Sequence, residues 1–370
     1  MRKIIISGYY GFKNSGDDAL LLSIIEDLKQ RGLDDRVVVL SANPFETERI
    51  YGVKSVNRIN PFSVLCQLLS ARLLISGGGT LIQDGTSTKS LLYYLAIIMT
   101  ARLLGTKVML YSNGIGPLNR SSNQRITKYV LNRVQLITLR DKRSKEVLDE
   151  IGVTKPKIVI TADPAFRIAS SPRSMGMHLI TNSGAPGDRR YLGIAIREWK
   201  TLPPDFTDMI AEAADYAAEK YDLYPIFMPM QPKKDYRICV NVMNKMKNQS
   251  AVINGDVSIY DMLSVVANMD ICIGMRLHTL IYAAAMSVPI IGLVYDPKVS
   301  GFMEYAEQKI YHQVEELTVQ KLCSSIDLCR KNYGKIKEKL NITRFDMQKK
   351  AALNGDYAAE LFEKGSVSLE

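Results

Sequence analysis

The sequence predicts an α/β protein with two doubly wound, parallel-sheet domains in tandem and a helical C-terminal tail. Three observations predict this class. Short β-rich apolar runs alternate with helix-length segments from the first residue to about Asp296, which is typical of parallel sheets with crossover helices. The 370 residues are enough for two domains with separate cores. Apolar residues make up 46% and charged residues 23% of the chain, as in packed globular proteins.

The first domain is expected over residues 1–168. Its helix candidates have apolar residues spaced near 3.6 positions apart, and a Gly stands close to several of their ends. The strand candidates are KIIIS, RVVVLSA, ARLLISGG, TKVMLYS, LITLR and KIVITA, and the helix candidates are DDALLLSIIEDLKQRG, TSTKSLLYYLAIIMTARLLG, QRITKYVLNRV and RSKEVLDEIG. A stretch rich in Ser, Pro, Gly and Arg then breaks the alternation, which predicts a linker over 169–190.

The second domain is expected over 191–310, where strand and helix patterns alternate again. Its strand candidates are YLGIAIR, LYPIFMP, AVING, DICIG and PIIGLVY, and its helix candidates are DFTDMIAEAADYAAEKY, DYRICVNVMNKMK and SIYDMLSVVANM. Residues 311–370 are polar and helical in pattern and predict a C-terminal tail. Doubly wound domains bind ligands outside the carboxyl ends of their strands, so we expect a site in the cleft where the two domains face each other.

The first candidate strand end is GYYGFKNSGDD, from Gly8 to Asp18. It nearly fits the phosphate-binding pattern GxxxxGK[ST], but two Asp stand at the Lys and Ser/Thr positions and would repel a triphosphate. Two readings stay open. The stretch is either a glycine turn in which Asp17 helps to cap the next helix, or a glycine-lined wall for a sugar or lipid-linked acceptor. In the second reading Asn14, Gly16 and Asp17 bind the substrate.

Two further glycine turns follow strands of the first domain. Gly77, Gly78 and Gly79 permit close backbone approach and expose amide donors, which suits a ligand. Asn113 begins a similar turn, NGIGP. A structural role is equally open for each turn, because glycine turns are common in α/β folds.

Side chains that follow four strands of the second domain predict a cationic pocket for a small anion. They are Arg197, Gln231, Asp235, Arg276 with Leu277 and His278, and Lys298. Arg276 stands at the expected start of a helix, where free N–H groups and the helix dipole favour an anion, and a guanidinium strengthens such binding. A neighbouring anion favours the protonated form of His278, which suits a general acid. The alternative is a satisfied core histidine.

The sequence shows no cluster of Asp, Glu, His or Cys with metal-ligand spacing, so we expect no metal site. Five cysteines without a CxxC pair indicate neither a disulfide framework nor a zinc site and favour a reducing cytoplasm. The formal charge of +10 favours anionic partners. Its scattered basic residues argue against nucleic acid, and the basic stretch 330–350 is interpreted as a solvated helix face.

Two apolar runs, 64–75 and 91–101, are shorter than the ~20 residues that a membrane-spanning helix needs. We interpret the second run as a buried helix. The alternative is that both runs form a patch that contacts a membrane surface.

Six motifs in order resemble the polysaccharide pyruvyl transferase family, most closely bacterial cell-wall-polymer enzymes of the CsaB type. They are GYYGFKNSGDDALL, ISGGGTLIQD, SNGIGP, LRDKRSKEVLDEIGV with Arg140 and Asp141, TADPAF at Asp163, and GMRLHTLIYAAAMSVPIIGLVYDPKV. The resemblance extends from about Lys3 to Phe302.

The resemblance implies a two-domain fold like the GT-B glycosyltransferases and a transferase that needs neither metal nor cofactor. Phosphoenolpyruvate would be the donor, and the product would be a 4,6-ketal of pyruvate on a sugar. The implied acceptor is β-linked N-acetylmannosamine of a lipid-linked secondary cell-wall polymer precursor, a polymer associated with S-layer anchoring. The enzyme would work in the cytoplasm, in peripheral contact with the anionic inner face of the membrane. Arg197 and Arg276 would hold phosphoenolpyruvate beside the Leu277 backbone, and His278 would be the general acid.

Two other functions stay open. The first is a GT-B nucleotide-sugar glycosyltransferase or epimerase, in which an acidic residue such as Glu304 would receive a ribose. The second is a non-catalytic subunit that binds a lipid carrier. The general base in the pyruvyl transfer is also open, with Asp17, Asp235 and His278 as candidates.

Overall fold

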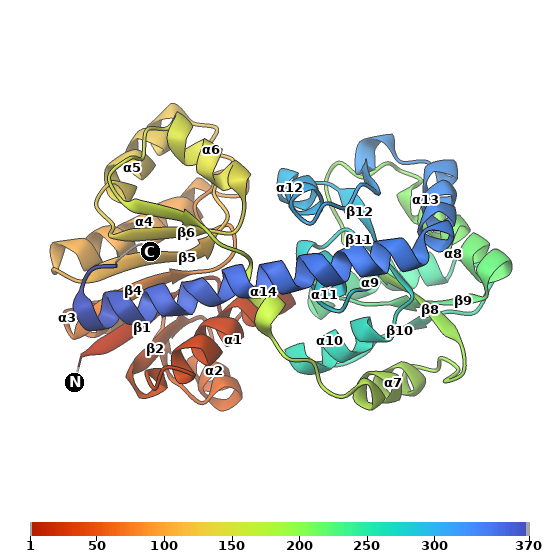
Figure 1. Ribbon diagram of the computed structural model, residues 1–370, viewed down its shortest axis with the longest axis horizontal. Helices are drawn as coiled ribbons and strands as arrows, with labels where there is room; N and C mark the ends of the chain where they lie inside the picture. Colours follow the sequence, from red (N-terminus) through yellow and green to blue (C-terminus); the bar gives the residue numbers. More distant parts are fainter. Residues whose placement is uncertain (1, 368–370) are drawn as a thin grey trace. The chain divides into compact units, whose positions relative to one another are not determined.

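The computed structural model describes residues 2–367 and contains two compact units, each with a parallel sheet (Figure 1). Unit 1 comprises Met1–Arg167 and Met347–Glu370, and unit 2 comprises Ile168–Asp346. The α/β class, with two Rossmann-like domains and a C-terminal helix, is confirmed.

The sheet of unit 1 has seven parallel strands in the order β3-β2-β1-β4-β5-β6-β7. Their bounds are β1 Lys3–Ser7, β2 Val37–Ser41, β3 Lys54–Asn57, β4 Ala71–Gly77, β5 Lys107–Asn113, β6 Leu136–Leu139 and β7 Lys157–Ile160. Successive side chains of a strand point to opposite faces. Accordingly, Ile4 and Ile6 belong to one core, and Ile5 belongs to the other.

Helices cover both faces of this sheet. One face packs against α1 (Ser15–Lys29) and the end of α14 (Tyr333–Lys364). The other face packs against α3 (Pro61–Leu69), α4 (Thr88–Leu103), α5 (Ser121–Leu131) and α6 (Lys142–Glu150). The short helix α2 (Pro44–Tyr51) joins β2 to β3. Sequence patterns did not single out α2 or β3, because β3 is only four residues long and its sequence, KSVN, contains one apolar side chain.

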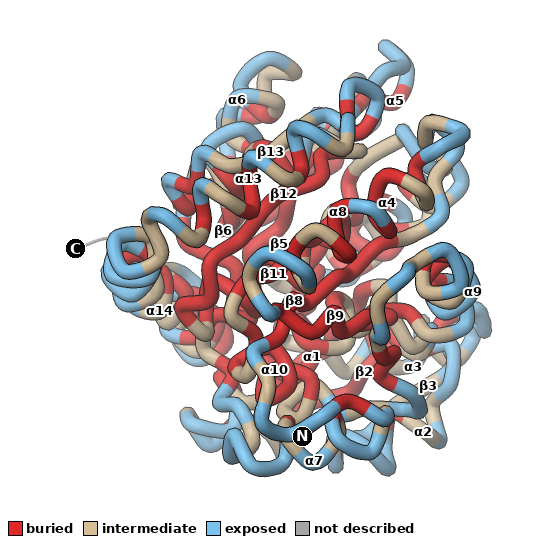
Figure 2. The backbone as a smooth tube through the Cα atoms, turned by 90° about the vertical axis from the view of Figure 1, so that its right-hand side faces the viewer, coloured by how far each residue is buried: buried red, intermediate tan, exposed pale blue. Residues whose placement is uncertain are grey.

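The sheet of unit 2 has six parallel strands in the order β10-β9-β8-β11-β12-β13. Their bounds are β8 Arg190–Ala195, β9 Leu223–Phe227, β10 Ala251–Val252, β11 Ile271–Gly274, β12 Ile290–Val294 and β13 Tyr311–Gln313. Figure 2 shows β8, β9 and β11 as buried segments. The helices α8 (Phe206–Tyr221), α9 (Pro232–Met243) and α13 (Val319–Lys331) share one core with them.

The range expected to be a linker contains a packed helix, α7 (Arg173–Asn182), which belongs to unit 2. It packs on α10 (Ile259–Ala267). The backbone of Gly176 donates a hydrogen bond to Ser264 Oγ at 2.9 Å, and a Cβ atom at Gly176 would lie 2.3 Å from the Ser264 carbonyl oxygen. The small residues that indicated a linker therefore permit close helix packing.

The region expected to be a separate tail is divided between the two units. β13 and α13 belong to unit 2, whereas α14 from Met347 onward belongs to unit 1. In unit 1, Asn354 accepts a hydrogen bond from the Thr161 hydroxyl at 2.9 Å and donates one to the Ala162 carbonyl at 3.3 Å. This buried amide fixes the helix against the end of β7.

One of the two long apolar runs serves the core of unit 1, and the other does so only in part. Leu91, Tyr94, Leu95 and Ile98 of α4 are buried, as expected for a core helix. Residues 64–75 form most of α3 and the first five residues of β4, so this run is part helix and part buried strand. Within residues 2–367, no helix combines the length and hydropathy that crossing a membrane requires.

Candidate active site

Loops at the carboxyl ends of β8, β9, β11 and β12 bring the predicted cationic residues to one edge of the unit 2 sheet. Arg197 follows β8, Asp235 follows β9, and Arg276 follows β11. The loop after β11 stays attached to its neighbour, because the Met275 N–H donates to the Ala195 carbonyl at 2.8 Å. Since β8, β11 and β12 are adjacent, Arg197, Arg276 and Lys298 come from neighbouring strand ends.

Arg276 is held by Asp235, an acidic residue predicted to be a substrate-binding group. Its Nε donates to Asp235 Oδ2 at 3.1 Å, and its Nη2 donates to Asp235 Oδ1. Nη2 also lies 3.5 Å from Gln231 Oε1. Asp235 is fully buried and additionally accepts from the Gln231 backbone N–H at 2.8 Å. Asp235 therefore fixes the orientation of the Arg276 guanidinium, and Gln231 supports the pair.

The guanidinium of Arg276 keeps donors for a ligand. Its Nη1 has no hydrogen-bond partner within residues 2–367. Arg276 is the N-cap of α11 (Leu277–Ala285) and has an extended backbone, with φ −78° and ψ 125°. The first N–H groups of a helix lack intrahelical partners and lie at its positive end. Nη1 and the α11 amides are therefore suited to an anion.

His278 lies in the first turn of α11 and is partly buried. Its ring centroid lies 6.2 Å from that of Tyr282, and the two rings are tilted by 57°. The position after Arg276 and Leu277 places the imidazole at the end of the helix that favours negative ligands. An anion bound at this end would lie close to the imidazole, which places the side chain within reach for proton transfer.

Arg197 is held by aromatic rings instead of a carboxylate. Its guanidinium carbon lies 4.9 Å from the Trp199 ring centroid and 5.3 Å from that of Tyr295. Its Nη1 donates to the Tyr295 hydroxyl at 3.2 Å, and its Nε is buried without a hydrogen-bond partner in the described part of the chain. Tyr295 was not predicted to be a site residue, although it is the last residue of the predicted strand PIIGLVY.

The three cations differ in how their charge is balanced. Arg276 is paired with Asp235, and Lys298 Nζ lies 3.4 Å from Asp296 Oδ2 and 5.5 Å from the Tyr295 ring centroid. Arg197 forms no ion pair with any residue that the structure describes. Arg197 would therefore supply most of the unbalanced positive charge that attracts a bound anion.

The predicted residues of unit 1 also gather at the carboxyl edge of their sheet. Gly78 and Gly79 have φ of +58° and +73°, which L residues with side chains rarely adopt. A Cβ atom at Gly78 would lie 2.6 Å from Leu20 Cβ, and one at Gly79 would lie 3.1 Å from Asp17 Oδ1. These two glycines thus let the turn pack against α1, which gives them a structural role without a ligand. Gly77 packs similarly against Tyr10 and Ile24.

Some polar groups beside these glycines already form hydrogen bonds within unit 1. Asn14 caps α1 by accepting from the Gly16 N–H at 3.2 Å, and its Nδ2 donates to Asp17 Oδ2 at 2.5 Å. The Nδ2 of Asn113 donates to the Gly79 carbonyl at 3.4 Å, whereas its Oδ1 is buried without a partner within residues 2–367. The Asn113 oxygen is thus an available acceptor.

One carboxyl group that was not predicted lies beside Asp17, and its pKa is raised toward neutral pH. Burial, together with the neighbouring charges of Asp17 and Glu46, raises the pKa of Asp18 to about 7, and Lys13 opposes this shift. The Asp-Asp sequence was the available signal, but burial cannot be read from it. Among residues 2–367 no group of three His, Cys, Asp or Glu side chains is placed to hold a metal ion.

Residues 14–297 match the family described as polysaccharide pyruvyl transferase. The amylovoran biosynthesis protein AmsJ of Erwinia amylovora is 20% identical over 259 residues. The aligned region covers 65% of this chain and 62% of AmsJ, so the chain spans less than two thirds of that relative's length.

Solved structures share the fold at low sequence identity. HepE of Anabaena in complex with UDP and glucose has a TM-score of 0.65 and 13% identity, with 98% of this chain and 100% of HepE covered. MnaA of S. aureus with UDP has a TM-score of 0.67 and 10% identity, with 99% and 97% covered. UDP-GlcNAc 2-epimerase from Neisseria meningitidis, bound to UDP-GlcNAc, has a TM-score of 0.63 and 11% identity, with 97% and 99% covered.

At such identities these structural neighbours establish the fold alone. The family match is different in kind, because it covers most of the chain, from Asn14 through the Arg276-Leu277-His278 segment to Pro297. The chain therefore belongs to the polysaccharide pyruvyl transferase family.

Proposed function

We propose that this protein transfers the pyruvate-derived group of phosphoenolpyruvate to a saccharide as a ketal and releases phosphate. Family membership supports a pyruvyl transferase that acts on a polysaccharide. One observation supports phosphoenolpyruvate as the donor. Arg197, which has no carboxylate partner among residues 2–367, and Arg276, which Asp235 orients, lie at neighbouring strand ends beside His278.

Phosphoenolpyruvate carries a carboxylate and a phosphate on one small carbon skeleton, so it needs two cationic groups and a nearby acid. Arg276 Nη1 and the first amides of α11 suit one anionic group, and Arg197 suits the other. Lys298 lies on the next strand end and adds positive charge. Arginines stabilise a departing phosphate through charge-assisted hydrogen bonds, which supports a metal-independent reaction.

The reaction balances with one acid and two sugar hydroxyls. His278 protonates the methylene carbon of the enol phosphate, and C2 becomes an oxocarbenium-like electrophile. One sugar hydroxyl adds to C2, phosphate leaves with its bridging oxygen, and the second hydroxyl closes the ring. Of the two hydroxyl protons, one replaces the proton that the acid gave to the methyl group, and the other leaves with phosphate. A positioned acid contributes about 10²–10⁴-fold to such a step.

The contacts of Asp235 separate it from the other candidates for general base. Both of its oxygens accept hydrogen bonds, and the side chain is fully buried. We therefore assign Asp235 a positioning role, which leaves Asp17 and the deprotonated His278 as candidates for the base.

For the acceptor we propose β-linked N-acetylmannosamine of a lipid-linked precursor of a secondary cell-wall polymer, with S-layer anchoring as its biological setting. The CsaB-type motifs support this choice. The carboxyl edge of the unit 1 sheet supplies Asn14, Asp17 and the Asn113 oxygen for saccharide hydroxyls. An enol phosphate donor is a cytoplasmic metabolite, so we place the reaction on the cytoplasmic side of the membrane.

NMR of one reaction mixture tests this function. The protein is incubated with phosphoenolpyruvate and a synthetic lipid-linked disaccharide that ends in β-linked N-acetylmannosamine, with a chelator present. We expect equal amounts of inorganic phosphate in the phosphorus spectrum and of a new ketal methyl singlet in the proton spectrum. Phosphate release without the methyl singlet would contradict the transfer, and turnover that required added divalent metal would contradict metal independence.

A nucleotide-sugar enzyme is the second candidate, because HepE, MnaA and the meningococcal epimerase are all described with UDP or a UDP-sugar. Glu304 of α12 (Pro297–Tyr305), the expected ribose acceptor, is exposed and accepts a hydrogen bond from the Tyr311 hydroxyl at 3.3 Å. Calorimetric titration with UDP and with phosphoenolpyruvate separates the two functions. Tight binding of UDP with no binding of phosphoenolpyruvate would favour this candidate.

A further inference from the structure

The net charge of the chain is concentrated in one segment of unit 1. Residues 51–140 contain 11 Lys and Arg but one acidic residue, Asp84, and so carry +10. The chain as a whole has 48 basic and 38 acidic residues, so the other 280 residues hold 37 of each sign. Charge asymmetry of this kind points to a surface that meets a polyanion or an anionic membrane.

This basic segment includes three neighbouring helices, α3, α4 and α5, none of which contains Asp or Glu. All three cover the same face of the unit 1 sheet, and α4 packs against both α3 and α5. We call their outer side the α3–α5 surface.

Large apolar side chains are exposed on the α3–α5 surface. On α3, Phe62 is 74% and Leu69 is 65% exposed, and they flank the exposed Leu65 at helical spacing. Leu103 ends α4 with 80% exposure, and Tyr129 of α5 is also exposed. The outer side of a surface helix is normally polar, so these side chains indicate a partner that accepts apolar groups.

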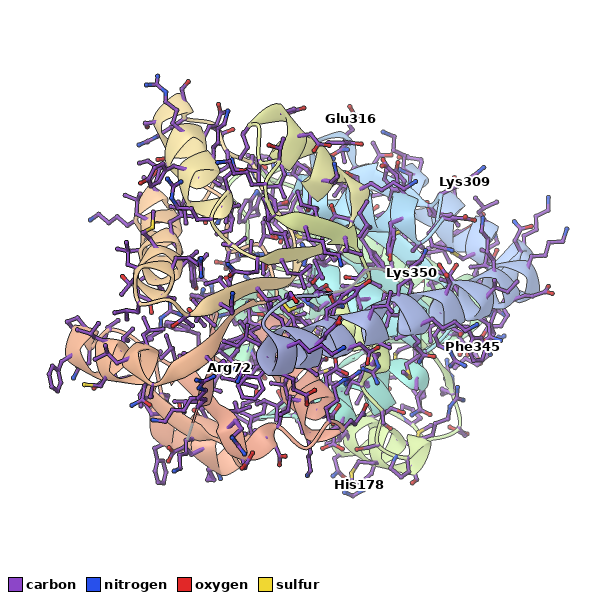
Figure 3. All side chains as sticks on the ribbon, turned by 60° about the vertical axis from the view of Figure 1, so that its left-hand side comes forward. Arg72, His178, Lys309, Glu316, Phe345 and Lys350 are labelled. Carbon is purple, nitrogen blue, oxygen red and sulfur yellow. The ribbon has the colours of Figure 1, made fainter. Side chains whose placement is uncertain are left out.

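Cations border these apolar side chains. Leu69 lines a depression of about 680 Å³ together with Arg2, Arg72 and Lys107. Leu103 and Tyr129 line a second depression, of about 380 Å³, together with Arg102 and Arg133. Arg72 is labelled in Figure 3, and it also donates to the Glu363 carbonyl. Apolar side chains beside Lys and Arg are the combination that enters an anionic lipid interface.

Other occupants fit these observations less well. Nucleic acid would pair with the cations but would leave exposed Phe62, Leu69 and Leu103 without a partner. A second copy of the chain would bring two surfaces of the same high positive charge together. An anionic bilayer satisfies both features, because its phosphates attract the cations and its acyl boundary accepts the apolar side chains.

We propose that the α3–α5 surface docks on an anionic lipid bilayer, with Phe62, Leu69 and Leu103 entering the interface. This docking goes beyond the proposed function, because it needs no assumption about the donor, the acceptor or the reaction. It would hold for any enzyme activity of this chain.

Vesicle sedimentation with paired variants tests the docking. The full chain is mixed with vesicles of phosphatidylglycerol and phosphatidylcholine, and with vesicles of phosphatidylcholine alone. An apolar variant carries Phe62→Ser, Leu69→Ser and Leu103→Ser. Its control carries Ile342→Ser and Phe345→Ser on the unit 2 part of α14, where Ile342 is 67% and Phe345 is 53% exposed. Phe345 is labelled in Figure 3. Circular dichroism and the thermal midpoint establish that each variant is folded.

A second pair of variants tests the charge. Arg125→Gln with Lys128→Gln removes two exposed cations of α5, and Lys335→Gln with Lys337→Gln removes two exposed cations of α14. Each cation near an anionic surface is worth about a fivefold change in affinity, so the α5 pair should weaken vesicle binding by about 25-fold. The α14 pair should leave vesicle binding unchanged.

We expect wild-type binding to the mixed vesicles only, with loss on addition of salt and in both α3–α5 variants. Absence of vesicle binding at low salt would overturn the proposal. Equal binding by the apolar variant would also overturn it, because charge alone would then account for the attraction. A parallel titration with duplex DNA tests whether the partner is nucleic acid instead of a bilayer. DNA binding stronger than vesicle binding would assign the surface to nucleic acid and overturn the proposal.

Discussion

The carboxylate of Asp235 and the guanidinium of Arg276 form a two-point hydrogen-bonded pair in the interior of unit 2, with one contact at 3.1 Å from Nε to Oδ2. The Asp235 side chain is 1% exposed and that of Arg276 is 10% exposed. The pair turns a flexible cationic side chain into a fixed one, with Nη1 left for a ligand. Two sequence positions, 41 residues apart, thus act as one group.

Removing the charge of Asp235 should destabilise the fold. Asp235→Asn leaves the buried Arg276 charge without a counter-ion, and breaking a buried pair in this way costs about 3–5 kcal/mol. Urea denaturation measures the free energy of unfolding. The control is Asp149→Asn in the exposed pair Lys145–Asp149, where a loss below about 1 kcal/mol is expected. Similar losses in both variants would mean that the Asp235–Arg276 pair has no special role.

The two arginines should contribute unequally to phosphoenolpyruvate binding. Arg197→Gln removes the guanidinium that has no ion-pair partner among the described residues, so affinity should fall by about 10–100-fold, as for a lost charge-assisted contact. Arg276→Lys keeps a charge but loses the fork to Asp235, and about a tenfold loss is expected. Calorimetric titration measures both. Unchanged affinity in the Arg197 variant would show that the anion binds elsewhere.

Sequence patterns predicted all strands except β3 and β13, together with the strand ends of the site, because both depend on local order. Alternating apolar runs were enough to place β8, β11 and β12, and hence the neighbourhood of Arg197, Arg276 and Lys298. The partners of those cations were not predictable, because the Asp235–Arg276 pair depends on the relative orientation of two loops. The same holds for Tyr295, which the register of β12 brings to Arg197.

Composition misled where small residues had a packing role. Gly176 lies in a Ser-, Pro- and Gly-rich stretch that reads as a linker, but its missing side chain lets α7 approach α10. Gly78 lies in a glycine turn that was considered as a ligand site, yet its close approach to Leu20 of α1 already requires a glycine. Such distinctions need the distance to a residue that is remote in sequence.

Asp18 should give the stability of unit 1 a measurable pH dependence. Burial, together with Asp17 and Glu46, raises the pKa of Asp18 from an ordinary value of 3.8 to about 7. Between these two values the folded state binds more protons at this site than the unfolded state. The free energy of unfolding therefore falls as pH rises from about 4 to about 7, by at most about 1.4 kcal/mol per pH unit.

Comparison with Asp18→Asn isolates this contribution, because all other titrating groups are shared. The difference in unfolding free energy between the variant and the wild type should grow in favour of the variant across the same pH range. Urea denaturation at several pH values measures it. A constant difference would mean that the pKa of Asp18 is the same in the folded and unfolded states.

His278 should be required for turnover but not for donor binding. If its imidazolium protonates the enol carbon, His278→Ala removes the acid while Arg197 and Arg276 still hold phosphoenolpyruvate. We expect kcat to fall by about 10²–10⁴-fold with little change in the calorimetric affinity for the donor. The control is His178→Ala on the exposed side of α7 (Figure 3), which should keep wild-type turnover.

The source of the methyl proton and the pH profile test the same role by independent measurements. In D₂O the ketal methyl group should carry one deuterium, because the solvent-exchangeable imidazolium proton becomes a methyl proton. The wild-type rate should fall as pH rises through the pKa of the acid, since only the protonated imidazole can donate. Near-normal turnover in His278→Ala, with deuterium still incorporated, would show that another group is the acid. His278 would then be a residue of the first turn of α11 without a catalytic role.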